Sequence, residues 1–101
     1  KIQEFRTAVY LLLGYKVDIM NTNQWKLSSM YSEQKEDSLL FQITQTSPTS
    51  EKRIEILDTE FSKAIPEDTM TMLTRFHSYP AFLANLTLEL FNKQTVFQHT
   101  F

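Results

Sequence analysis

Apolar residues recur through the first thirteen positions with the spacing of a coiled-coil seam. The residues at these a and d positions, called the seam below, are Ile2, Phe5, Val9 and Leu12. Their spacing of three, four and three predicts a helix that pairs with the same helix of a second chain. An amphipathic core helix of a monomer is the alternative, because two heptads separate the two arrangements poorly.

The second half of this helix has no polar side, since every residue from Ala8 to Leu13 is apolar. A helix without a polar side is buried on more than one side. We therefore expect the second half to lie between a partner and the chain's own sheet. Gly14, the only glycine of the chain, should end the helix in a left-handed conformation. Residues 1–14 are then the end of a dimeric coiled-coil stem, and residues 15–101 form a head.

The period of the apolar residues changes from helical to two after Gly14. This alternation predicts strands over residues 15–20, 24–31, 39–43 and 53–61. The short connections between them favour antiparallel neighbours, and so a four-stranded meander. Ser29 interrupts the apolar row of the second strand, and a bulge there would turn Met30 inward.

Proline marks the start of two further helices. Pro66 suits the first turn of a helix whose apolar side would be Met70, Leu73 and Phe76 or His77. The next helix should run from Pro80 to about Lys93, capped by Ser78 or Tyr79. Its expected apolar stripe consists of Phe82, Leu83, Leu86 and Leu90, widened by Leu88 and Phe91.

These elements together predict an α+β fold. It has an N-terminal coiled-coil helix, a four-stranded antiparallel sheet, and two C-terminal helices packed on one face of that sheet. The last eight residues show no clear period, so the final helix should end before them. The expected core consists of Trp25, Leu27, Phe41, Ile54, Phe82, Leu86 and Leu90.

Composition argues against several classes of function. The net charge of −2 gives no electrostatic footprint for nucleic acid, and no apolar run is long enough to span a membrane. The absence of cysteine excludes disulfides and thiolate zinc sites and suits the cytosol or nucleus. One glycine cannot build a phosphate-binding loop, and His77 and His99 belong to no metal-ligand cluster. We therefore expect no enzyme, no metal and no cofactor.

Three features instead suggest regulated binding to other proteins. In a parallel dimer Lys1 at a g position would face Arg6 of the other chain at an e position, leaving a basic rim. Such a rim could receive an acid or a phosphate, although simple solvation is the alternative. Ser47-Pro48 has the form of a proline-directed phosphorylation site, and Thr95, just past the expected end of the last helix, is a second candidate phosphosite.

Three stretches of the chain resemble the C-terminal domain of the Mad (mitotic arrest deficient) family of spindle-checkpoint scaffolds. They are Lys1-Ile2-Gln3-Glu4-Phe5-Arg6 with Leu13 to Ile19, Leu57-Asp58-Thr59-Glu60-Phe61-Ser62, and Pro80 to Leu83 with Leu86 to Phe91 and Gln94-Thr95-Val96. The resemblance extends over essentially the whole chain. Residues 45–53 and 66–75 look divergent.

The resemblance implies a non-enzymatic scaffold domain of the spindle assembly checkpoint. It implies a homodimer with an RWD-like head that docks a phosphorylated segment of the checkpoint kinase Bub at the kinetochore and supports assembly of the anaphase inhibitor complex. The family's Arg-Leu-Lys motif for that segment would lie a few residues before Lys1, and the small Mad protein would bind further upstream. Other implied partners include the anaphase activator.

The resemblance also implies a place in the cell and a modification. The protein would reside in the nucleus, at kinetochores in mitosis and at the nuclear envelope or pore in interphase. The threonine that matches Thr95 would be the target of a checkpoint kinase. The alternative reading is a structural kinetochore subunit with an RWD-type head that binds its partners constitutively.

Overall fold

The computed structural model describes the backbone of residues 1–99 and the side chains of residues 1–94. Its elements follow the order of one helix, four strands and three further helices, so the predicted α+β class is confirmed. The chain divides into two compact units, residues 1–63 and residues 64–101. Each unit is described by itself. The division at residue 14 into stem and head stays a prediction.

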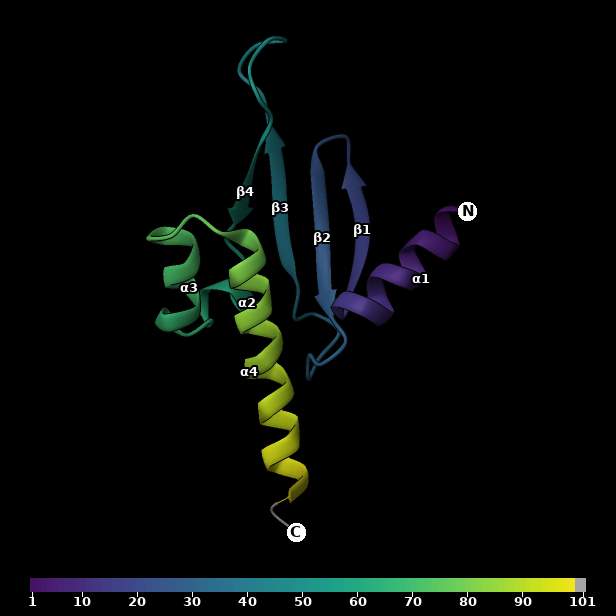
Figure 1. The fold of residues 1–101 in the computed structure, drawn as a ribbon, viewed down its shortest axis with the longest axis vertical. Coiled ribbons are helices and arrows are strands. Elements are labelled where there is room, and N and C mark those ends of the chain that lie inside the picture. Colours follow the sequence, from purple (N-terminus) through teal and green to yellow (C-terminus); the bar gives the residue numbers. More distant parts are fainter. Residues whose placement is uncertain (100–101) are drawn as a thin grey trace. The chain divides into compact units, whose positions relative to one another are not determined.

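Helix α1 spans Ile2–Leu13 and ends at Gly14, as its sequence predicts (Figure 1). Gly14 has a φ of 81°, and its N–H donates a hydrogen bond to the Tyr10 carbonyl at 2.9 Å. A β-carbon at this position would lie 3.6 Å from the nearest atom of Met30, which is an ordinary contact. The left-handed backbone, and not the available space, therefore requires glycine here.

The four strands form an antiparallel meander in the order β1-β2-β3-β4 (Figure 1). Their bounds are Tyr15–Asn21 for β1, Gln24–Ser29 for β2, Leu39–Thr44 for β3 and Arg53–Leu57 for β4. One cross-strand row joins Ile19, Trp25, Phe41 and Ile56. The alternate residues, such as Asp18 opposite Lys26, point to the other face. Both the meander and the phase of each strand were predicted correctly.

Two strand ends differ from the prediction. Strand β2 stops at Ser29, and the irregularity of the β1–β2 ladder lies between Ile19 and Asn21 instead of at Ser29. The N–H of Met30 donates to the Gly14 carbonyl at 2.8 Å, so the chain beyond β2 is held by the end of α1 and not by a bulge. Strand β4 stops at Leu57 because Thr59 starts the short helix α2, Glu60–Lys63.

The predicted core is correct in part. The buried apolar side chains are Tyr15, Leu39, Phe41, Ile65, Leu73, Phe82, Leu86 and Leu90. Trp25 and Leu27 are only half-buried, and Ile54 is wrong, with 39% of its surface exposed. Ile54 lies on the edge strand β4, opposite Ile43 in β3, where no strand covers its outer side.

Helix α3 spans Glu67–Thr74 and ends earlier than its sequence predicts. Thr69 and Leu73 are buried, whereas Phe76 and His77 lie beyond the helix and are exposed. Phe76 and His77 are therefore not on its apolar side. The chain turns at His77, whose φ of 53° is incompatible with a continuing helix.

Helix α4 spans Tyr79–His99 and is preceded by the predicted cap Ser78. The Ser78 hydroxyl accepts a hydrogen bond from the Ala81 N–H at 3.1 Å. The stripe of Phe82, Leu86 and Leu90 is buried as predicted, but Leu88 and Phe91 are exposed and do not widen it. The helical backbone continues past Lys93.

The longer α4 changes the position of one candidate phosphosite. Thr95 was expected just past the last helix, but its backbone lies within α4. That expectation is therefore wrong. A helix that already has four turns can be extended by further residues even where the sequence lacks a periodic apolar pattern, because extension is easier than nucleation. The side chain of Thr95 lies outside the described residues.

Candidate protein-binding surface on helix α1

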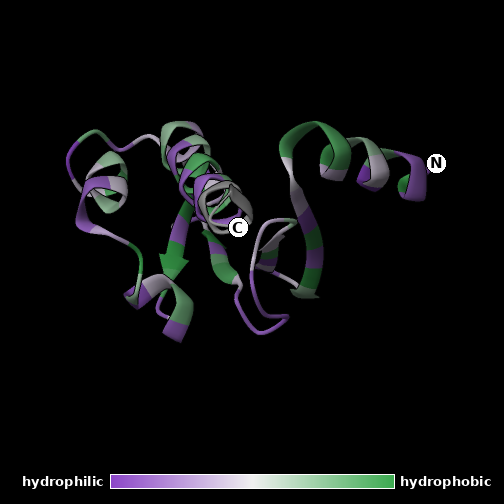
Figure 2. Ribbon diagram, turned by 90° about the horizontal axis from the view of Figure 1, so that it is seen from below, coloured by the Kyte–Doolittle hydropathy of each residue, from purple (hydrophilic) through white to green (hydrophobic). Residues whose placement is uncertain are grey.

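The seam of α1 is exposed in this chain. No residue of α1 is buried, and Ile2 and Phe5 each expose 71% of their surface. Leu12 exposes 82%, while Val9 is half-buried. Figure 2 shows the second half of this helix as the most hydrophobic part of α1. Exposed apolar surface is typical of sites that bind another molecule.

The side of α1 that adjoins the seam at Arg6 faces the chain's own strand β1. Gln3, Arg6, Thr7 and Tyr10 follow one another at helical spacing along this side. They line a hollow of about 290 Å³ together with Lys16, Val17 and Asp18 of β1. An amphipathic core helix would bury its apolar side against its own domain. Helix α1 does the reverse, since no residue of its seam lines this hollow.

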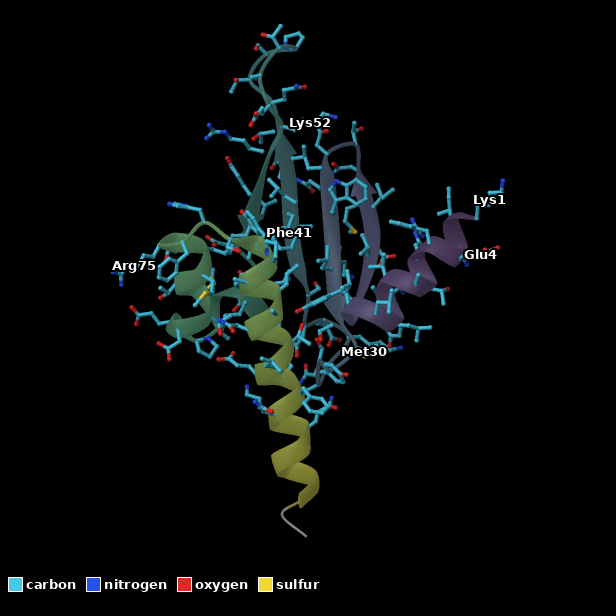
Figure 3. The ribbon with its side chains drawn as sticks, in the orientation of Figure 1. Lys1, Glu4, Met30, Phe41, Lys52 and Arg75 are labelled. Carbon is cyan, nitrogen blue, oxygen red and sulfur yellow. The ribbon has the colours of Figure 1, made fainter. Side chains whose placement is uncertain are left out.

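The candidate basic residues lie on α1 as the sequence places them. Lys1 and Arg6 are exposed, and Figure 3 shows Lys1 and Glu4 at the end of α1 that projects from the sheet. Asp18 lines the same hollow as Arg6, a proximity that the sequence analysis missed. Among residues 1–94, neither Lys1 nor Arg6 forms an ion pair. Both cations are therefore available to an anionic partner.

A second hollow, of about 500 Å³, adjoins the first and has Tyr10, Lys16 and Asp18 in common with it. Its lining also includes Lys26 and Ser28 of β2 and residues of the loop between β2 and β3. The lining carries the cations Lys16, Lys26 and Lys35 and the acids Asp18, Glu33 and Asp37. The alternation of β1 and β2 could have indicated this polar surface, because it places these strand residues on one face.

The two candidate phosphosites lie elsewhere in the chain. Ser47 is exposed in the loop between β3 and β4, whereas α1 lies beside β1, at the other edge of the same sheet (Figure 1). Thr95 belongs to the second unit. The structure therefore groups Lys1 and Arg6 on one helix and places Ser47 apart from them.

The described side chains give no indication of a metal centre. Among residues 1–94, no three acidic or histidine side chains gather closely enough to hold a metal ion. No helix within the described residues is long and apolar enough to cross a membrane. What the surface of α1 offers is an apolar strip beside exposed cations, which is suited to binding another polypeptide.

Comparison with known proteins relates this chain to mitotic checkpoint proteins. The family model described as MAD, mitotic checkpoint protein, matches residues 1–95. The chain is 50% identical over 96 residues to the human mitotic spindle assembly checkpoint protein MAD1, covering 95% of this chain and 13% of that protein.

More distant relatives come from a yeast and a plant. The chain is 32% identical over 95 residues to the spindle assembly checkpoint component MAD1 of Yarrowia lipolytica, covering 93% of this chain and 13% of that protein. It is also 32% identical over 108 residues to the mitotic spindle checkpoint protein MAD1 of Arabidopsis thaliana, covering 96% of this chain and 14% of that protein. The chain thus spans about a seventh of the length of these relatives.

Proposed function

The chain belongs to the MAD family of mitotic checkpoint proteins, and on that premise we propose that it is a dimeric, non-enzymatic binding module of a spindle assembly checkpoint scaffold. The module docks a phosphorylated segment of the checkpoint kinase Bub at the kinetochore and supports assembly of the anaphase inhibitor complex. The small Mad protein binds upstream segments. Outside mitosis the protein resides in the nucleus and at its envelope or pores.

The exposure of the seam is the single observation that supports the proposed dimer. Its four side chains face away from the hollow between α1 and β1, so they are available to a second copy of the same helix. Burying an apolar side chain of this size contributes about 1.5–3 kcal/mol. Two heptads hold a dimer poorly alone, so we propose that the helix continues upstream as a coiled coil.

Phe5→Asp tests the dimer. The substitution puts a charge at a d position, and an unpaired charge in a paired seam costs several kcal/mol. We expect light scattering on a chain that includes the upstream helix to report monomer or aggregate for this variant. Thr7→Asp is the matched control, since Thr7 lies on the side of α1 that faces β1 and should leave the dimer intact. Unchanged dimer affinity in Phe5→Asp would refute the coiled-coil proposal.

We propose that Lys1 and Arg6 contribute to binding the phosphorylated Bub segment. Their exposure and the absence of an ion pair to either within residues 1–94 support this role. A charge-assisted hydrogen bond to phosphate contributes about 1.5–3 kcal/mol where it is partly desolvated and under about 1 kcal/mol where it is exposed. The phosphopeptide would meet the upstream basic motif first and Arg6 about two turns later.

Arg6→Glu should weaken binding of the labelled phosphopeptide at least several-fold in a chain that includes the upstream motif. Dimerisation should change little, because Arg6 is outside the a and d positions. Titrations at low and moderate salt, with the unphosphorylated peptide as control, measure the effect. Equal affinities of wild type and variant at low salt would mean that the basic rim is only a solvated edge.

The alternative function is a structural kinetochore subunit with an RWD-type head. Such a subunit would bind its partners with or without phosphate, so the unphosphorylated peptide separates the two proposals. We also propose Thr95 as the target of a checkpoint kinase, with phosphate there ordering or freeing the end of the chain. Phosphopeptide mapping after treatment with that kinase would test the assignment.

A further inference from the structure

The loop that joins β3 to β4 contains a motif that the proposed function does not use. Residues 45–52 connect the two strands and extend beyond them at the free end of the hairpin (Figure 1). Ser47 and Pro48 are both exposed, and within this loop only Ser50 is half-buried. Figure 3 shows Lys52 at the foot of the loop, where it meets the strands.

Ser47 and Pro48 form the first half of a tight turn. The Ser50 N–H donates a hydrogen bond to the Ser47 carbonyl at 3.1 Å, which places Pro48 at the second position of the turn. The Ser50 hydroxyl accepts from the Ser47 N–H at 3.0 Å and donates to the Ser47 carbonyl at 2.8 Å. The Ser47 hydroxyl lies 3.2 Å from the Thr49 hydroxyl.

This turn can open without disturbing the sheet. Within the described residues, the side-chain hydrogen bonds of Gln45 through Ser50 all end inside the loop. None of them ties the loop to a strand or to a helix. An enzyme that binds its substrate as an extended segment could therefore draw out residues 45–52, which is not possible for residues held in a ladder.

The motif is also unique in the sequence. Of the three prolines, Pro66 follows Ile65 and Pro80 follows Tyr79, so Pro48 is the only one that follows serine or threonine. A serine/threonine kinase that requires proline directly after the acceptor residue thus has one possible site in these 101 residues. The site lies in an exposed connection of the sheet whose side-chain hydrogen bonds end within the loop itself.

We propose that Ser47 is the acceptor of a phosphate from a proline-directed serine/threonine kinase that uses ATP. The Ser47 Oγ forms a bond to the γ-phosphorus while the bond from that phosphorus to the bridging oxygen breaks, and ADP leaves. The hydroxyl proton passes to the base of the kinase. The phosphate brings about two negative charges to a loop whose nearest following cations are Lys52 and Arg53.

Phosphorylation should alter the turn and leave the sheet unchanged. Phosphoserine at position 47 has no hydroxyl hydrogen, so its contact with Thr49 persists only with the Thr49 hydroxyl as the donor. Because the loop lies at the surface, the melting temperature should shift by less than about 4 °C. Binding of a phosphopeptide at α1 should not change, since α1 lies beside β1, at the other edge of the sheet (Figure 1).

The test is incubation of the purified protein with a proline-directed kinase and ATP, followed by intact mass and site mapping. We expect one phosphate per chain, on Ser47. Ser47→Ala should abolish the incorporation, and Pro48→Ala should slow it about tenfold or more, as loss of one fitted apolar contact does. Thr49→Ala is the matched control, because it removes a neighbouring hydroxyl that no proline follows and should leave Ser47 reactive.

Three results would overturn the proposal. The first is incorporation that persists in Ser47→Ala. The second is incorporation that is unaffected by Pro48→Ala. The third is a folded protein that takes up no phosphate while a free peptide of residues 43–55 does, since the loop would then be closed to the kinase.

Discussion

His77 shows how one residue ends a helix that its sequence would continue. Its φ of 53° is the only positive value of a non-glycine residue that the structure records. The His77 N–H donates to the Leu73 carbonyl at 3.2 Å, and the Ser78 N–H donates to the Met72 carbonyl at 2.8 Å. These bonds satisfy carbonyls at the end of α3. They also hold His77 in a left-handed conformation, which is sterically unfavourable for a residue with a β-carbon.

His77→Gly should raise the free energy of unfolding by about 0.5–1 kcal/mol. Glycine adopts positive φ without the steric cost that a β-carbon carries, although its unfolded chain is more flexible. Denaturant unfolding of the two proteins measures the change. His77→Ala is the control, since alanine keeps the β-carbon, and an equal gain in that variant would mean that the backbone is not the cause.

Helix α2 shows how a short element is fixed at its start. The Thr59 N–H donates to the Ser62 hydroxyl at 2.8 Å, and the Ser62 N–H donates to the Thr59 Oγ1 at 3.0 Å. This is a reciprocal capping box with serine at the third position. The Thr59 hydroxyl also donates to the Ser38 carbonyl at 3.1 Å, which fixes α2 to the chain just before β3. The segment from Leu57 to Ser62 therefore has a structural role.

Thr59→Ala should lower the free energy of unfolding by about 0.5–2 kcal/mol. It removes the cap of α2 and leaves the Ser38 carbonyl without this donor. Thr59→Ser keeps the hydroxyl and should retain most of the stability. Thermal or denaturant unfolding measures both variants. An equal loss of stability in Thr59→Ser and Thr59→Ala would contradict the capping role.

Burial over the whole molecule is concentrated in few side chains. In residues 1–63 Leu39 and Phe41 are almost fully buried, and in the second unit Phe82 and Leu86 are. Strand β3, which contains Leu39 and Phe41, is an inner strand of the sheet and has a strand on each side. The exposed apolar side chains of α1 lie outside this core, and their exposure is the basis of the proposed partner.

Leu86→Ala should lower the free energy of unfolding by about 2–5 kcal/mol, because it leaves a cavity at a side chain that is 2% exposed. Leu88→Ala is the matched control in the same helix. Leu88 is 57% exposed, so its truncation should change stability by less than about 0.5 kcal/mol. Similar losses for the two variants in denaturant unfolding would contradict the burial of this stripe.

The local periods of the apolar residues were sufficient to predict most of the helices and strands. Alternation placed Ile19, Trp25 and Phe41 on one face of the sheet, and Gly14 marked the end of α1. These features depend on residues close in sequence and on two fixed backbone periods. The seam and the basic residues of α1 were predicted in the same way, because helical spacing alone places them on the helix.

The tertiary structure decided which of these residues are buried and which are exposed. Ile54 and Phe41 belong to the same alternating pattern, but Ile54 lies on an edge strand and is exposed whereas Phe41 lies on an inner strand and is buried. Similarly, only the reversal of the chain at Gly14 directs the side of α1 with Arg6 toward Asp18 and leaves the seam free. Exposure depends on neighbours that are distant in sequence, and a period of two or of 3.6 residues carries no information about them.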